Sequence, residues 1–224
     1  MAKLLLKNTT EVKFNPDNTI TVKMHDFPFT REMCGSETDK QLWDAYQDAG
    51  WHPRFIIEYF PKIIWLGKPG QGRRTYITDT DTMAITDWGI AKKQYPNTVW
   101  FSVQMLERSK REERKLQKKY GPNLYVTGFE EIMVHELAHC IMLNKAGTMG
   151  SENIENQIIA LYRKSLLTDD EKRDLSKLLQ QKQEIEHGKI FRVLYSQFCE
   201  KYGVAHNPEY WERNHKRDPF KKMK

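Results

Sequence analysis

The hydrophobic pattern of the chain changes at Gly121-Pro122, and this change limits the folds that are open to it. Before the break, short segments alternate apolar and polar residues with the period of two that strands show. After it, apolar residues recur every three to four positions, as in amphipathic helices. The predicted helices cover residues 129–145, 152–166, 170–186 and 189–202. A strand-rich first half before a helical second half predicts an α+β fold.

The first half predicts a small N-terminal β-sheet with one helix. Residues 12–14 and 19–24 flank a turn-forming Asn-Pro-Asp-Asn segment and predict a β-hairpin. Ser36 and Asp39 have the spacing of a helix N-cap, and the helix should cover residues 37–49. Further strands are predicted at residues 54–60, 63–66, 75–78, 83–86 and 98–103. The last of these segments alternates apolar and polar residues most regularly.

Length and composition predict one globular domain. The chain has 224 residues, of which 39% are hydrophobic and 29% are charged, so it can bury a core and differs from disordered chains. We assign residues 1–212 to a single domain and residues 213–224 to a basic C-terminal tail. No apolar segment reaches the roughly 18 to 20 residues of a membrane-spanning helix, so no membrane partner is expected.

Two features indicate a reducing, cytoplasmic location. Only three leucines follow Lys3 before charge returns at Lys7, which is too short for a Sec signal peptide. The three cysteines are widely spaced and odd in number, which argues against a disulfide framework. Delivery into a host or target cell by another route stays open, and no feature indicates the oligomeric state.

The net charge of +6 is concentrated in two segments. Residues 107–119 hold seven basic and three acidic residues, and residues 212–224 hold six and two, so the remainder of the chain is slightly acidic. A body that binds nucleic acid would carry its positive charge more widely. The distribution therefore predicts a mixed-charge helix and a basic tail, and it argues against nucleic acid as a partner.

The segment His135-Glu136-Leu137-Ala138-His139 carries the strongest chemical signal. Positions i and i+4 of a helix share one face, so both imidazoles can reach one metal ion while Glu136 lies beside them. The flanking residues are uncharged, as a half-buried helix requires. Thr127 with Glu130 predicts an N-cap, and Gly147 predicts the C-terminal end of this helix. The pattern predicts a zinc site in the middle of a helix.

Two carboxylates downstream compete for the third ligand position. Glu152 has Asn156 one helical turn later, where a polar side chain can hydrogen-bond the far nitrogen of a zinc-bound histidine. Glu155 has the apolar Ile159 at that position. We therefore favour Glu152 as the ligand with Asn156 behind a histidine, and Glu155 stays the alternative. The other histidines (His25, His52, His187, His206 and His215) lack ligand-like spacing and are interpreted as structural or exposed.

Residues 127–166 resemble the gluzincin metallopeptidases, in which a glutamate with an aspartate four residues later follows His-Glu-x-x-His. The sequence departs from that pattern by having Asn156 in place of the aspartate. Arg192 and Tyr195 form an Arg-x-x-Tyr pattern similar to that of clostridial neurotoxin light chains and of type III secretion effector metallopeptidases. This resemblance implies a zincin-like fold, and it implies that Arg192 and Tyr195 stabilise the oxyanion of the reaction.

The residues and the resemblance together predict a zinc-dependent endopeptidase that acts on a specific intracellular protein or peptide. Zn²⁺ held by His135, His139 and Glu152 would activate a water molecule, with Glu136 as the general base. An edge strand before the active-site helix often pairs with the extended substrate in such enzymes, and residues 98–103 are the candidate.

Two other functions stay open. The segment from Glu152 to Asn156 is similar to the Glu-x-x-Ala-Asn/Asp stretch of ImmA/IrrE peptidases, which cleave repressors, except for Glu155. Alternatively, the chain is a non-catalytic protein-binding or nucleic-acid-binding module. A structural zinc would need four protein ligands, and no fourth is evident near the motif. A SprT-like DNA-repair protease would have a third histidine soon after the motif, and none occurs before His187.

Overall fold

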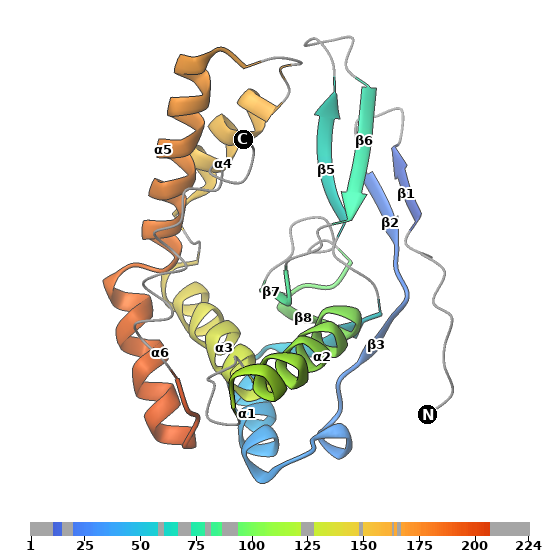
Figure 1. Ribbon diagram of the computed structural model, residues 1–224, viewed down its shortest axis with the longest axis vertical. Helices are drawn as coiled ribbons and strands as arrows, with labels where there is room; N and C mark the ends of the chain where they lie inside the picture. The colour runs from blue at the N-terminus through green and yellow to red at the C-terminus, as the bar shows by residue number, and fades with distance from the viewer. Residues whose placement is uncertain are drawn as a thin grey trace.

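The fold is that of a computed structural model, which Figure 1 shows with its helices and strands labelled. The structure describes residues 11–14, 20–57, 61–66, 73–78, 82–86, 94–121, 128–147, 150–162, 164 and 167–206. The basic tail predicted at residues 213–224 lies outside these ranges.

A mixed four-stranded sheet is built around β8 (Thr98–Ser102). Its order is β3 (Asp26–Pro28), β4 (His52–Ile56), β8 and β7 (Ala84–Thr86). Only β4 and β8 run parallel, and the other two pairs are antiparallel. The short strand β7 therefore forms one edge of the sheet and β3 the other.

The central place of β8 corrects one prediction from the sequence. We expected residues 98–103 to form an edge strand, but β8 lies between β4 and β7. All five of its residues are buried, including the polar Thr98 and Ser102. The alternation of apolar and polar residues therefore did not mark one solvated face. Ser102 instead accepts a hydrogen bond from the backbone of Met105 and caps the helix that follows.

Two antiparallel hairpins form separate two-stranded sheets. The predicted N-terminal hairpin is confirmed as β1 (Glu11–Phe14) and β2 (Ile20–Lys23). The second hairpin joins β5 (Pro61–Leu66) and β6 (Arg73–Thr78), and β5 contacts α4.

The helices agree closely with the predicted ranges. They are α1 (Glu37–Asp48), α2 (Val103–Tyr120), α3 (Phe129–Ala146), α4 (Glu152–Tyr162), α5 (Asp169–Glu186) and α6 (Lys189–Tyr202), with a short 3-10 helix at Arg31–Met33. In the part of the chain that the structure describes, α4 ends four residues earlier than expected. The α+β prediction is confirmed. No helix among the described residues is long and apolar enough to span a membrane.

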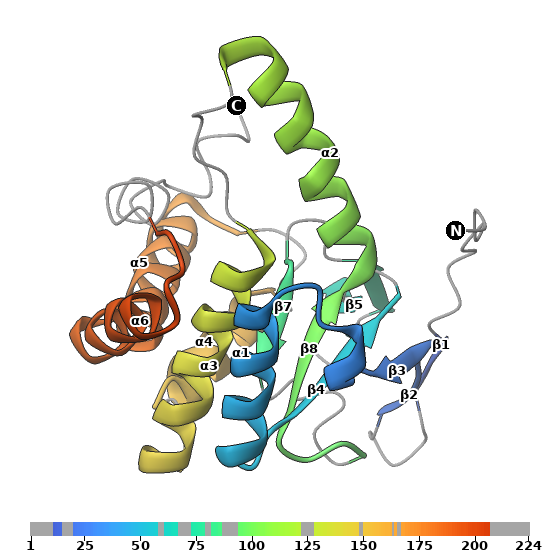
Figure 2. The ribbon, with the colours of Figure 1, turned by 90° about the horizontal axis from the view of Figure 1, so that it is seen from below.

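Helix α3 lies at the centre of the core. It packs against α1, α6 and the edge strand β7, and Figure 2 shows α1 and α3 side by side between the sheet and α6. The main hydrophobic cluster joins Leu42 and Tyr46 of α1 to Met133 and Leu137 of α3. Phe191 of α6 belongs to the same cluster. The active-site motif predicted from the sequence is therefore on the most buried helix of the described chain.

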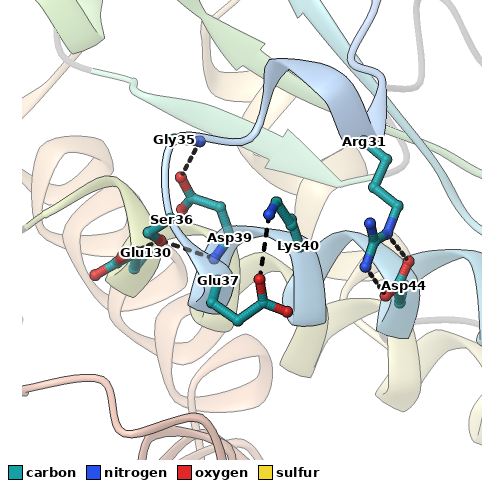
Figure 3. A network of polar contacts seen from close by, with 8 residues as sticks. All are labelled: Arg31, Gly35, Ser36, Glu37, Asp39, Lys40, Asp44 and Glu130. Carbon is teal, nitrogen blue, oxygen red and sulfur yellow. Dashed lines mark hydrogen bonds and ion pairs between the residues drawn. The ribbon is translucent and has the colours of Figure 1, made fainter.

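The N-terminal end of α3 contacts α1, and its C-terminal end is a glycine in the left-handed conformation. Its N-cap is Gly128 rather than the predicted Thr127, which lies outside the described residues. Glu130 accepts a 2.7 Å hydrogen bond from Ser36, the confirmed N-cap of α1 (Figure 3). The helix ends, as predicted, at Gly147, whose φ of 71° favours glycine. The hydrogen bond between Ser36 and Glu130 joins the N-terminal end of α1 to that of α3.

Candidate metal centre

Helix α3 carries His135, Glu136 and His139 in its middle turns, as the sequence predicts. His139 and Glu136 are buried, whereas His135 is partly exposed. The centroids of the imidazole rings of His135 and His139 lie 4.9 Å apart. The two rings therefore face the same space at the side of the helix.

A third histidine, His187, completes the cluster. The Nε2 atom of His139 lies 3.2 Å from Nε2 of His135 and 3.0 Å from Nε2 of His187. The ligand atoms of all three side chains lie within 4.8 Å of one another. Three imidazole nitrogens bound to one tetrahedral zinc ion at 2.0–2.1 Å would lie about 3.3 Å apart. The two separations measured from His139 are close to that value.

The convergence of these nitrogens favours a cation at their centre. Each neutral imidazole has one N–H and one lone pair, so the Nε2 atom of His139 cannot form good hydrogen bonds with both neighbours by donating. A metal ion would accept all three lone pairs at once. Burial lowers the pKa of His139 to about 3, with a smaller contribution from the nearby Lys182. His139 is therefore neutral, as a metal ligand must be.

His187 is placed by the junction between α5 and α6. It follows the last residue of α5, and Gly188 is the N-cap of α6. A Cβ atom on Gly188 would lie 2.4 Å from the carbonyl oxygen of Glu184, so this tight junction requires glycine. The junction turns His187 toward α3, where its ring centroid lies 4.8 Å from that of His139.

Two nitrogens of the cluster face away from its centre. Nδ1 of His187 lies 2.9 Å from the amide of Gln183, one helical turn earlier. The Gln183 atom at this distance is the amide nitrogen, which donates to Nδ1. If the amide were turned by 180°, its oxygen would accept the Nδ1 proton and leave the Nε2 lone pair for a metal. Nδ1 of His139 is buried without a hydrogen-bond partner among the described residues. Phe191 packs its ring against all three imidazoles.

The side chain of Glu136, the neighbour of His135 on α3, is held by the edge strand β7. The hydroxyl of Thr86 on β7 donates a 2.6 Å hydrogen bond to Oε2 of Glu136. Burial raises the pKa of this carboxyl to about 7, and the Thr86 hydrogen bond opposes the shift. A carboxylate with a pKa near neutrality suits a general base, because it can both accept and return a proton.

The side chains of Arg192 and Tyr195 lie in different surroundings, one exposed and the other buried. Tyr195 is buried, its ring centroid lies 6.1 Å from that of His135, and its hydroxyl donates a hydrogen bond to Glu131. The side chain of Arg192 is exposed and lines a surface hollow with Lys189 and Val193 on α6. The structure therefore brings Tyr195 to the side of the cluster and leaves the Arg192 side chain on an exposed face of α6.

Among the described side chains, no α4 residue predicted as ligand or support belongs to the metal-ligating group. Glu152 begins α4, but its side chain lies outside the described part, so its role as a ligand stays a prediction. Glu155 forms a 3.2 Å ion pair with Lys182 of α5. Asn156 is exposed and makes no contact with a histidine within the described ranges.

The sequence interpretation missed His187. We expected it to be structural or exposed because it lies 48 residues after His139 and has no regular ligand spacing. The available signal was its position between two predicted helices, directly before a glycine. That signal identifies a helix junction but does not say which helix the junction faces.

Comparisons with known proteins give no relative for this chain. No family model, no curated protein and no solved structure matches it.

Proposed function

We propose that the chain is a zinc-dependent endopeptidase whose metal ligands are His135, His139 and His187. The observation that carries the proposal is the convergence of the three Nε2 atoms, with Glu136 directly following His135 on α3. His187 replaces Glu152 as our preferred third ligand. The substrate class is a protein or a peptide, because amide hydrolysis is the reaction that a helical His-Glu-x-x-His site most often serves.

The ligand set supports zinc in a catalytic site. Three imidazole ligands leave the fourth tetrahedral position open, whereas a structural zinc is closed by four protein groups. The metal-ligating group found among the described residues has three members. His135 and His187 are partly exposed, so a water molecule or substrate can approach from their side.

The chemistry divides between the metal and Glu136. Bound zinc would lower the pKa of water and polarise a carbonyl group. Glu136 would accept the proton of the attacking water and deliver it to the leaving amine. The Thr86 hydroxyl occupies Oε2 of Glu136, which leaves Oε1 available for this proton.

The position of β7 supports a zincin-like arrangement. β7 is an edge strand, it runs antiparallel to β8, and it packs against α3. An extended peptide that paired with this edge would run beside α3, the helix that carries His135, Glu136 and His139. We therefore move the substrate-pairing strand from residues 98–103 to Ala84–Thr86.

The metal assignment is tested by zinc content. Purified wild type, His139→Ala, His187→Ala, Glu152→Gln and Glu136→Gln are measured by plasma mass spectrometry after equilibration with zinc and removal of excess metal. We expect near-stoichiometric zinc in wild type, Glu136→Gln and Glu152→Gln, and loss of zinc in both histidine variants. Zinc in His187→Ala together with its loss in Glu152→Gln would return the third position to Glu152. A folded wild type without zinc would reject the metal centre.

The catalytic assignment needs a separate measurement. The zinc-loaded protein is incubated with a proteome-derived peptide library, and new N-termini are identified by mass spectrometry. Glu136→Gln should retain zinc but lose cleavage by roughly 10²-fold or more, because it lacks the general base. The cleavage profile would also separate an effector-like peptidase from an ImmA/IrrE-like regulatory peptidase. Full zinc occupancy without cleavage by wild type would instead favour a non-catalytic module.

A further inference from the structure

Glu131 is a buried carboxylate one helical turn before His135. Its side chain is 3% exposed, and Oε1 accepts a 2.5 Å hydrogen bond from the hydroxyl of Tyr195 on α6. Residues at i and i+4 of a helix lie on the same face with Cβ atoms about 5–6 Å apart. Glu131 and His135 therefore share the face of α3 that packs against α6.

We propose that Glu131, held by Tyr195, is a positioning residue for His135. This inference rests on the proposed zinc function. Three neutral imidazoles do not reduce the double positive charge of a zinc ion, and a nearby buried carboxylate does. Groups behind a metal-bound histidine also fix its ring orientation and raise its basicity. Glu131 occupies the place from which it can do both for His135.

The contacts of Tyr195 give it a role different from the one that the resemblance implied. Its hydroxyl points to Glu131, and its ring stacks on Phe191 with an interplanar angle of 9°. Phe191 in turn packs against the ring of His135 at a centroid distance of 4.9 Å. Tyr195 thus orients the Glu131 carboxyl and supports the aromatic wall of the cluster, which are functions of a positioning residue.

Neighbouring Glu130 provides a matched control. It is on the same turn of α3 but about 100° further round the helix, and it accepts a hydrogen bond from Ser36 on the α1 side (Figure 3). Glu130→Gln and Glu131→Gln each remove one negative charge from the first two turns of α3. Only the second change removes it from the face that carries His135.

The proposal is tested by zinc affinity. Wild type, Glu131→Gln, Tyr195→Phe and Glu130→Gln are titrated in competition with a chromophoric chelator, and thermal unfolding of each metal-free protein is recorded. We expect Glu131→Gln to weaken zinc binding 10- to 100-fold, as loss of a group behind a ligand typically does. Tyr195→Phe should weaken it in the same direction, and Glu130→Gln should stay within about threefold of wild type. The cobalt-substituted protein should show a changed ligand-field spectrum in Glu131→Gln and an unchanged one in Glu130→Gln.

The outcomes separate this proposal from the function on which it rests. Wild type without zinc affinity would reject the proposed function itself. Tight zinc binding by wild type with unchanged affinity in a folded Glu131→Gln protein would overturn only the role of Glu131. If Glu131→Gln does not fold, Tyr195→Phe decides, and wild-type zinc affinity in that variant would overturn the proposal. An equal loss of zinc affinity in Glu130→Gln would mean that the net charge of the protein, and not the position of Glu131, causes the effect. That result would also overturn the proposal.

Discussion

Helices α2 and α3 have the same length of 18 residues but opposite surroundings. Nine residues of α3 are buried, whereas among the described side chains of α2 only Met105 is buried. Figure 2 shows α2 extending away from the body while α3 lies inside it. The outer turns of α2 are stabilised by local interactions, such as the exposed Glu112–Lys115 pair. A local pattern is enough to form a helix, but only packing against other elements can position side chains for chemistry.

The largest expected difference between the two helices concerns their leucines. Leu137→Ala in α3 should lower the free energy of unfolding by about 2–5 kcal/mol, because Leu137 is 2% exposed and its removal leaves a cavity. Leu116→Ala in α2 should change it by no more than about 0.5 kcal/mol, because Leu116 is 39% exposed. Urea unfolding followed by circular dichroism measures both values. Equal losses would mean that α2 packs against a surface that its exposure does not indicate.

A smaller difference is expected for two tyrosines. The hydroxyl of Tyr46 in α1 donates a buried hydrogen bond to the carbonyl oxygen of Met133 and so joins α1 to α3. Tyr46→Phe should cost about 1 kcal/mol, the usual net value of such a bond. The matched change Tyr120→Phe at the exposed end of α2 should have little effect, because Tyr120 is 62% exposed. A neutral Tyr46→Phe variant would show that packing alone holds α1 on α3.

The features predicted correctly from the sequence are those that depend on neighbouring residues. Ser36 begins α1 and Gly147 ends α3, because caps and left-handed glycines act within one turn. The period of apolar residues located the helices to within a few positions. His135, Glu136 and His139 were correctly placed together on one helix, since their spacing is a property of the helix itself.

The features that the sequence did not predict depend on how distant elements meet. β8 is central rather than at the edge, because the order of strands follows from packing and not from alternation within one strand. His187 reaches the cluster only because the α5–α6 junction packs on α3. Tyr195 points to Glu131 for the same reason, since contacts between α3 and α6 have no regular spacing in the sequence.

The smallest expected effect is a pH dependence. It involves the carboxyl of Asp39, whose pKa depends on charges from both helices. Asp39 accepts a 3.0 Å hydrogen bond from the backbone of Gly35 (Figure 3). Burial raises the pKa of Asp39 and is the largest cause, and Glu130 of α3 also raises it. The hydrogen bond from Gly35 lowers the pKa, and Ser36 and then Lys110 of α2 lower it by less. Because the net shift is upward, the folded state binds the proton more tightly than the unfolded state. Wild type therefore loses stability, relative to a variant that cannot titrate, as the pH rises from the unfolded pKa through the folded pKa.

Asp39→Asn removes this titration. The stability of Asp39→Asn minus that of wild type should therefore become more positive between pH 3 and neutrality, whatever its value at pH 3. Asp169→Asn in α5 is the control of opposite sign, because the hydrogen bond from Lys172 lowers the pKa of Asp169, so that difference should become more negative over the same range. Urea unfolding at a series of pH values measures both differences. If Asp39→Asn followed the sign of the control, the hydrogen bond from Gly35, with smaller contributions from Ser36 and Lys110, would outweigh burial and Glu130.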